Sequence, residues 1–209
     1  FFTKEVFMLV TMKEILDRAK KDNYGVTSIM VDRSSLSYED NIAQTKETVK
    51  MCRPLNISVE AELGHVGQSE DYSSDGSDHF TKPEEVKKFV EETGIDCLAV
   101  AIGTAHGRYH GTPHIDFDLL KQITDVVDIP LVLHGGSGTG DENLRKAVKN
   151  GIQKVNLATE LVVAGKEELE TFIQDKNFDK WQLIPSFIKG YSDRLEHYVK
   201  LFDQENRAW

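Results

Sequence analysis

Short runs of apolar residues alternate along this chain with segments whose apolar residues recur at helical spacing. The apolar runs are bounded by polar or glycine-rich residues and are expected to be buried strands: 27–31, 57–63, 96–102, 131–133 and 154–159. Helical spacing marks the other segments: 11–22, 38–52, 81–94, 117–127, 141–150, 159–175 and 179–205. This alternation predicts an α/β fold with a parallel sheet covered by helices.

Turn and helix-breaking residues refine the boundaries of several elements. Thr81 is expected to cap the helix that begins there, and Gly94 is expected to end it. Pro185 and Gly190 are expected to break the last helical segment into pieces, because both residues weaken a helix interior. Residues 64–80 form a polar loop rich in Gly, Ser and Asp, and long loops are usually functional lids or disordered.

Polar side chains follow the predicted strands at the point where each strand ends: Asp32, Glu62, His106, His134 and Asn156. The carboxyl ends of strands are where α/β folds place their sites. Two histidines and two acids make a plausible divalent metal site, since zinc takes His nitrogen and carboxylate oxygen and a catalytic zinc keeps one position open. A single histidine at a strand end is more often structural, but two of them, each followed by glycine, favour a functional interpretation.

Other side chains with chemical potential have simpler explanations. Glu60 shares a strand face with Glu62, so one of these acids is expected to have a structural or supporting role. His65, His110 and His114 lie in predicted loops and are expected to be solvated.

Two successive glycine-rich or small polar loops follow the last two strands. Residues 134–138 read His-Gly-Gly-Ser-Gly and precede a predicted helix, and residues 156–159 end the next strand in a similar way. Loop amides followed by a helix N-terminus form a natural phosphate cradle. Two such units in succession are typical of the last two units of a TIM barrel.

Composition and charge restrict the possible partners. The 209 residues fit one domain, and a net charge of −10 argues against a nucleic-acid partner. The two cysteines, Cys52 and Cys97, are too few for a disulfide framework, which predicts a reducing, cytoplasmic location. The apolar stretch 1–10 is too short to span a membrane and lacks the layout of a signal peptide, so no membrane partner is expected.

One long motif runs from residue 59 to residue 70: Val59-Glu60-Ala61-Glu62-Leu63-Gly64-x-x-Gly67-x-x-Glu70. Four others occur in order along the chain: Met30-Val31-Asp32-x-Ser34, Ala101-Ile102-Gly103-Thr104-Ala105-His106-Gly107, Leu133-His134-Gly135-Gly136-Ser137-Gly138 and Val155-Asn156-Leu157-Ala158-Thr159-Glu160. Together these motifs resemble those of the class II, zinc-dependent fructose-bisphosphate and tagatose-bisphosphate aldolases. The resemblance extends from about residue 27 to the C-terminus, and residues 8–14 are similar to the N-terminus of that family.

The resemblance implies a fold, a reaction and a set of site residues. The fold would be of the TIM (β/α)8-barrel type, and the reaction would be reversible cleavage of fructose 1,6-bisphosphate to dihydroxyacetone phosphate and glyceraldehyde 3-phosphate. His106 and His134 would bind the catalytic Zn2+, Asp32 and Glu62 would line a second, transient position for a divalent or monovalent cation, and Glu70 would transfer a proton at the triose carbon. The phosphate and hydroxyl groups of the triose would be held by Gly107, Gly135, Gly136, Ser137, Asn156, Leu157, Ala158 and Thr159. Members of the family are commonly dimers or tetramers.

The chain departs from the family in one respect. It has no His-x-Asp-His type motif, which supplies a third zinc histidine and a catalytic aspartate upstream in the family. By this comparison roughly seventy residues and three strands of a ~250-residue barrel are absent between Val26 and Thr27. The expectation is a single domain over 1–209 that contains an incomplete barrel of five βα units. Two alternatives to a fructose-bisphosphate aldolase stay open: a tagatose-bisphosphate aldolase, and a non-catalytic, internally deleted remnant that binds metal or phosphate.

Overall fold

The computed structural model describes residues 26–67, 79–107, 109 and 113–207. Within these ranges one parallel sheet has the order β1-β2-β3-β4-β5, so each strand pairs with the next strand along the chain. The strands are β1 (Ser28–Val31), β2 (Ser58–Leu63), β3 (Cys97–Val100), β4 (Leu131–Leu133) and β5 (Ile152–Val155). The predicted parallel sheet is therefore confirmed, whereas the predicted helix at 11–22 lies outside the described residues.

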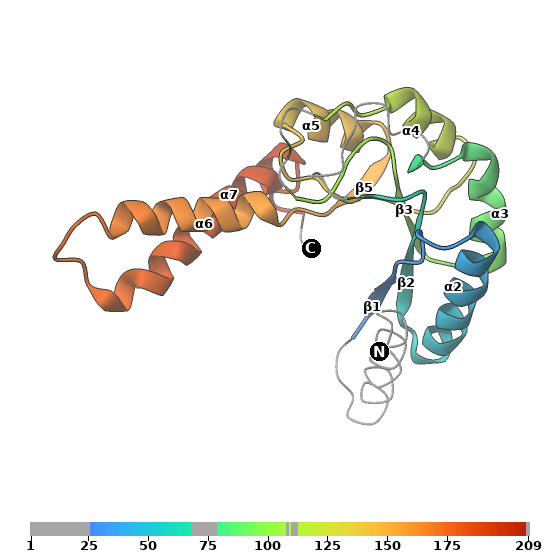
Figure 1. Ribbon diagram of the computed structural model, residues 1–209, viewed down its shortest axis with the longest axis horizontal. Helices are drawn as coiled ribbons and strands as arrows, with labels where there is room; N and C mark the ends of the chain where they lie inside the picture. Colours follow the sequence, from blue (N-terminus) through green and yellow to red (C-terminus); the bar gives the residue numbers. More distant parts are fainter. Residues whose placement is uncertain (1–25, 68–78, 108, 110–112, 208–209) are drawn as a thin grey trace.

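In the described ranges, four of the six α-helices cover the sheet from one side. The helices are α2 (Tyr38–Cys52), α3 (Pro83–Thr93), α4 (Phe117–Thr124), α5 (Asp141–Lys149), α6 (Thr159–Phe172) and α7 (Leu183–Leu201), with short 3-10 helices η1 (Arg53–Leu55) and η4 (Lys180–Gln182). Figure 1 shows α2, α3, α4 and α5 arranged in an arc along one side of the sheet, while α6 and α7 project away from it as a hairpin. Helices on one side distinguish this arrangement from a doubly wound sheet, which has helices on both faces. Among the helices of the described segments, none combines the length and the apolar character that crossing a membrane requires.

The two faces of the sheet carry different side chains. Along β2, Val59, Ala61 and Leu63 are buried and belong to the hydrophobic core, which also includes buried residues of α2, α3, α4 and α5. Because successive side chains of a strand point to opposite faces, Glu60 and Glu62 lie on the face away from this core. The sheet therefore separates a helix-covered apolar face from a polar face, and the polar face holds the candidate site.

Thr81 does not cap α3, contrary to the prediction. The N-cap of α3 is Lys82, and Gly94 ends the helix in the left-handed conformation, as expected. The Thr81 hydroxyl instead donates to the carbonyl oxygen of Leu63 (2.5 Å) and accepts from the amide of Ala101 (2.8 Å). Thr81 thus ties the chain leaving β2 to the chain leaving β3, and steadies the sheet edge where the site lies.

Helix α7 is continuous from Leu183 to Leu201, so the predicted break at Pro185 and Gly190 is wrong. Pro185 is the third residue of the helix, where the missing amide has no intrahelical partner to lose. Gly190 faces α6: a Cβ atom at this position would lie 2.4 Å from the carbonyl oxygen of Ala164. The close approach of α6 and α7 therefore explains the glycine at position 190, and a helix end does not.

Candidate active site

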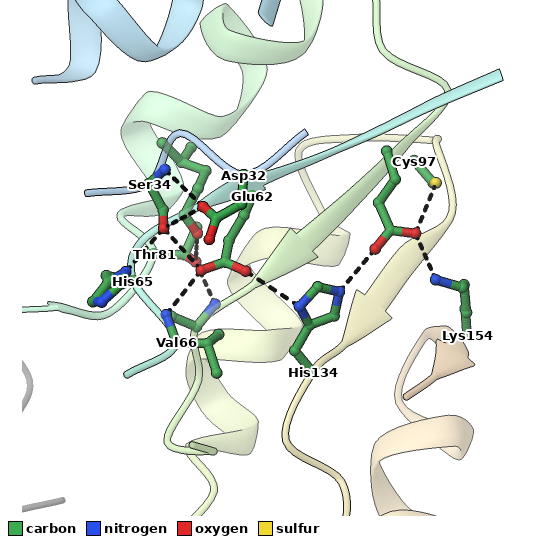
Figure 2. A network of polar contacts seen from close by, with 12 residues as sticks. Asp32, Ser34, Glu62, His65, Val66, Thr81, Cys97, His134 and Lys154 are labelled. Carbon is green, nitrogen blue, oxygen red and sulfur yellow. Dashed lines mark hydrogen bonds and ion pairs between the residues drawn. The ribbon is translucent and has the colours of Figure 1, made fainter. Parts of the chain in front are cut away.

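The carboxyl ends of β1 and β2 bring two predicted site acids into one hydrogen-bonded group (Figure 2). The Ser34 hydroxyl lies 2.7 Å from Oδ1 of Asp32 and 2.9 Å from Oε1 of Glu62. It also lies 2.9 Å from Nδ1 of His65, so the half-buried His65 contacts the site and the expectation that it is simply solvated is wrong. The amide of Val66 donates to Oε1 of Glu62 (2.9 Å), which holds this carboxylate at the strand end.

His134 lies between two buried carboxylates. Its Nε2 is 2.8 Å from Oε1 of Glu60, and its Nδ1 is 3.2 Å from Oε2 of Glu62. Burial alone would lower the pKa of His134, but the hydrogen bonds and charges of the two glutamates raise that pKa to about 9. The imidazolium therefore donates from both nitrogens at neutral pH and offsets much of the cost of burying two acids.

Glu60 connects His134 to the ammonium group of Lys154. Its Oε2 accepts from the Lys154 ammonium (2.7 Å), and the Cys97 thiol lies 3.7 Å from the same oxygen. Burial would raise the pKa of Glu60, but the bonds from His134 and Lys154 outweigh it and lower that pKa. Burial and the adjacent Glu60 charge raise the pKa of the Cys97 thiol to about 11, so it is protonated at neutral pH.

The second strand-end histidine, His106, lies beside the first. The ring centroids of His106 and His134 are 5.7 Å apart. Two imidazoles that bind one zinc ion at ~2.0 Å can have centroids up to roughly 6 Å apart. Burial and the neighbouring His134 charge lower the pKa of His106, which keeps its ring neutral with a lone pair free to bind a metal.

The donor types at this edge fit zinc, since imidazole nitrogen and carboxylate oxygen are both zinc ligands. The four predicted metal ligands, Asp32, Glu62, His106 and His134, gather at the same end of the sheet. Over the described ranges, however, no group of three or more His, Cys, Asp or Glu side chains is arranged to hold a metal ion. A zinc ion would have to replace one carboxylate contact of His134.

The predicted phosphate-binding glycines bring neighbouring loops together. Gly135 has a φ of +67°, and a Cβ atom there would lie 2.3 Å from the carbonyl oxygen of Ala105. The amide of Gly136 donates to the carbonyl oxygen of Asn156 (3.1 Å), so the β4 and β5 loops are joined directly. The Tyr109 hydroxyl lies 2.8 Å from the carbonyl oxygen of Ala105 and 3.0 Å from that of Gly135. These contacts place the predicted substrate loops side by side.

A pocket of about 420 Å³ lies where these loops meet α6 and α7. Its lining includes three predicted substrate-binding residues, Gly107, Ser137 and Thr159. The Ser137 hydroxyl accepts from the amides of Ala158 (3.2 Å) and Glu160 (3.4 Å). It therefore provides a hydrogen-bond partner for two amides at the N-terminus of α6. The other predicted substrate residues are placed differently: Gly135, Gly136 and Asn156 join the loops, Leu157 packs against the core, and Ala158 is the N-cap of α6.

Several side chains of the site were not singled out from the sequence. Arg194, on α7, is the cation among the residues that line the pocket, beside the acids Glu160 and Glu167. Lys154 belongs to a predicted strand, and nothing in its local sequence indicates that it contacts Glu60. The predicted proton-transfer acid Glu70 lies outside the described residues, so its role stays a prediction.

Comparisons with known proteins add an independent line of evidence. A family model described as fructose-bisphosphate aldolase class-II matches residues 10–207. The uncharacterized protein YdjI of Escherichia coli K12 is 42% identical, in a match that covers 88% of this chain and 66% of that protein. The crystal structure of the YdjI aldolase from Escherichia coli K12 matches with a TM-score of 0.77 at 37% identity, covering 94% of this chain and 67% of that one.

Two further solved structures have the same fold. A putative fructose-1,6-biphosphate aldolase from Coccidioides immitis matches with a TM-score of 0.77 at 32% identity, covering 93% of this chain and 69% of that one. The fructose-bisphosphate aldolase of Campylobacter jejuni matches with a TM-score of 0.75, covering 94% and 67%, and at 22% identity this likeness shows the fold alone. The chain therefore spans about two thirds of the length of these relatives.

Proposed function

Because the chain belongs to the class-II fructose-bisphosphate aldolase family, we propose that it cleaves a ketose bisphosphate reversibly into dihydroxyacetone phosphate and glyceraldehyde 3-phosphate. Its five βα units form part of a TIM-type barrel, as the sequence predicted. The observation that carries the proposal is the pairing of His106 and His134 at the strand ends. The loops that carry these two histidines also reach the pocket lined by Gly107 and Ser137. Two histidines that can bind a metal ion, next to a pocket with room for a phosphate group, are the combination that this reaction needs.

The proposal includes a zinc ion, which the family generally uses. His106 and His134 would bind it, with Glu62 and Asp32 close by for a second cation. A bound zinc ion would polarise the substrate carbonyl as a Lewis acid. Glu60 would keep the His134 ring in place, and Glu70 would accept or return the proton at the triose carbon.

The pocket supplies the groups that would hold the substrate phosphate. The N-terminus of α6 attracts anions through its aligned backbone dipoles, and Gly107 and Ser137 line the same space. Glu160 and Glu167 would repel a phosphate, so the positive charge of Arg194 offsets them. This balance matters in a chain with a net charge of −10, whose overall field disfavours an anionic substrate.

We also place the chain in a homo-oligomer, as the family resemblance predicts. The α6–α7 hairpin exposes large apolar side chains, with Trp181 76% exposed, Ile184 72% and Ile188 53%. Clusters of exposed apolar side chains on a projecting element are typical of protein–protein contact surfaces. This supports self-association through the hairpin.

The first experiment is a coupled assay of triose-phosphate release by the 209-residue chain. Purified protein is mixed with fructose 1,6-bisphosphate or tagatose 1,6-bisphosphate, in the presence of zinc or of a chelator. We expect zinc-dependent release that the chelator abolishes, and the faster substrate identifies the preferred sugar. A folded, zinc-loaded chain that releases no triose phosphate from either sugar would refute the proposal.

A non-catalytic role in binding metal or phosphate is the second candidate. One observation favours it: both ring nitrogens of His134 are already engaged by carboxylates. The two candidates differ in a simple way, because a binding remnant would hold zinc or triose phosphate without turnover. Equilibrium dialysis with zinc, beside the assay above, separates them.

We expect Arg194→Met to raise KM for the ketose bisphosphate by about 10- to 100-fold, with a smaller change in kcat. A charge-assisted hydrogen bond to phosphate contributes about 1.5–3 kcal/mol, which corresponds to that range. Steady-state kinetics of the variant check this, with the exposed Arg145→Met on α5 as the matched control. An unchanged KM in Arg194→Met would show that the guanidinium does not contact the substrate.

A further inference from the structure

Lys154 reaches across the polar face of the sheet. It lies on β5, next to Val132 of β4 in the strand register, while Glu60 lies on β2, three strands away in the sheet order. The Lys154 ammonium is nevertheless 2.7 Å from Oε2 of Glu60. On β3, Cys97 is the register partner of Glu60, and Ala99 is the register partner of Val132. The contact crosses the polar face of the sheet and joins two strands that are not neighbours.

The Glu60 carboxylate has one charged partner for each oxygen. Oε2 accepts from Lys154, and Oε1 accepts from Nε2 of His134 at 2.8 Å. Because the carboxylate is planar and rigid, fixing one oxygen also fixes the direction in which the other accepts. Without the lysine, Oε2 would keep only the Cys97 thiol at 3.7 Å, and a thiol is a weak donor.

We propose that Lys154 is a positioning residue that holds the Glu60 carboxylate against Nε2 of His134, and so sets the orientation of the His134 ring in the site. With Nε2 fixed in this way, Nδ1 faces Glu62 and the predicted metal position. Carboxylate groups that orient ligand histidines through the second ring nitrogen typically contribute 10- to 100-fold to metal affinity. In this chain the carboxylate is itself fixed by a lysine. The inference rests on the proposed function, in which His134 binds the zinc ion.

The charges of the four groups support this role. Glu60 and Glu62 are 4% and 1% exposed at their side chains, and His134 is 7% exposed, whereas Lys154 is 51% exposed. The ammonium thus keeps part of its hydration while it neutralises a buried acid, which lowers the desolvation cost of the pair. Two basic and two acidic side chains alternate in the order Lys154, Glu60, His134 and Glu62. Figure 2 shows His134, Glu62 and Lys154 of this series. Removing the lysine charge would leave Glu60 with His134 as its charged partner and the weakly donating Cys97 thiol on Oε2.

The test compares three variants: Lys154→Met, Lys154→Arg and Lys166→Met. Lys166 is the matched control, because it forms a surface ion pair with Glu170 at the same 2.7 Å. Zinc affinity is measured by competition with a chromogenic chelator, and kcat and KM are measured with the ketose bisphosphate. We expect Lys154→Met to weaken zinc binding 10- to 100-fold and to lower kcat with little change in KM. The zinc affinity and kcat of Lys154→Arg should stay within a few-fold of those of the parent chain. Lys166→Met should have the same zinc affinity and kcat as the parent chain.

A second readout does not need zinc or turnover. In the zinc-free chain, nuclear magnetic resonance of the His134 ring reports the exchange of its Nε2 proton, which should be slow in the parent and faster in Lys154→Met. A folded Lys154→Met with the parent's zinc affinity and the parent's ring signals would overturn the inference, even if its thermal stability had fallen. A parent that binds zinc but has no aldolase turnover would refute the proposed function alone, since the zinc and ring measurements still decide the role of Lys154. If Lys154→Met does not fold, the neutral Lys154→Gln carries the same comparison.

Discussion

The His134→Ala variant is expected to release triose phosphate at least about a hundredfold more slowly than the parent chain. Stabilisation of the developing charge by a metal ion is worth several kcal/mol, and each 1.36 kcal/mol corresponds to a factor of ten in rate. Both ring nitrogens of His134 contact carboxylates of the site, and alanine would remove both contacts. The coupled assay with saturating zinc measures the change.

The control for this variant is His197→Ala. The His197 imidazole is also paired with a carboxylate, at 2.9 Å from Asp141, but this pair lies exposed between α5 and α7. Loss of that pair should leave the rate unchanged. Because His134→Ala also leaves two buried carboxylates without a shared cation, circular dichroism must first establish that it folds, and His134→Gln serves if it does not. Folded His134→Ala with parental turnover would contradict the assigned role.

The Gly135→Ala variant is expected to lose at least ~3 kcal/mol of unfolding free energy. Alanine at a φ of +67° is strained, and its Cβ would lie 2.3 Å from backbone that cannot move without displacing the loop before His106. The same displacement would separate His106 from His134, so activity should fall together with stability. Urea unfolding monitored by tryptophan fluorescence and circular dichroism gives the change.

Gly140→Ala separates the two causes of this loss. Gly140 also has a positive φ, +86°, but no atom lies within 4 Å of the position that a Cβ would occupy. Gly140→Ala should therefore show only the backbone strain of its conformation (φ 86°, ψ 145°), about 1–3 kcal/mol, and keep its activity. Equal losses in the two variants would mean that contact with Ala105 contributes nothing.

The sequence predicted the sheet well where a strand is a short apolar run with a clear end. The fifth strand, expected at 154–159, instead lies at Ile152–Val155, and residues 156–158 form the loop before α6. At the end of the third strand, a side chain has replaced a backbone partner. The third strand was expected to continue to Ile102, but the structure ends it at Val100. The amide of Ala101 is bonded by the Thr81 hydroxyl, which no local pattern reveals. The predicted break in α7 failed for a similar reason, since the glycine there serves contact with another helix.

The site was predictable only where its residues are next to strand ends. Asp32, Glu62, His106 and His134 follow four strands, and parallel strands necessarily bring such residues to one edge. Lys154 and Arg194 enter the site from elsewhere, through a long side chain across the sheet and through packing of α7. Lys154 and Arg194 reach the site because segments far apart in the sequence pack together. The spacing of residues along the chain does not predict such contacts. The phosphate-binding role expected of Gly135 and Gly136 stays a prediction. Gly135 also lies close to the backbone of Ala105, and Gly136 lies close to the carbonyl oxygen of Asn156 and the side chains of Val155 and Leu157.

The strand order β1-β2-β3-β4-β5 makes the fold modular. In the described ranges every backbone ladder joins two consecutive βα units, whereas the contacts between distant units, such as Lys154 with Glu60, are made by side chains. Backbone hydrogen bonds of this kind let each ladder keep its register whatever lies beyond the β1 edge. The chain spans about two thirds of the length of two solved relatives and superimposes on them with a TM-score of 0.77. The same order favours folding by successive addition of units, with each new strand closing only a local loop.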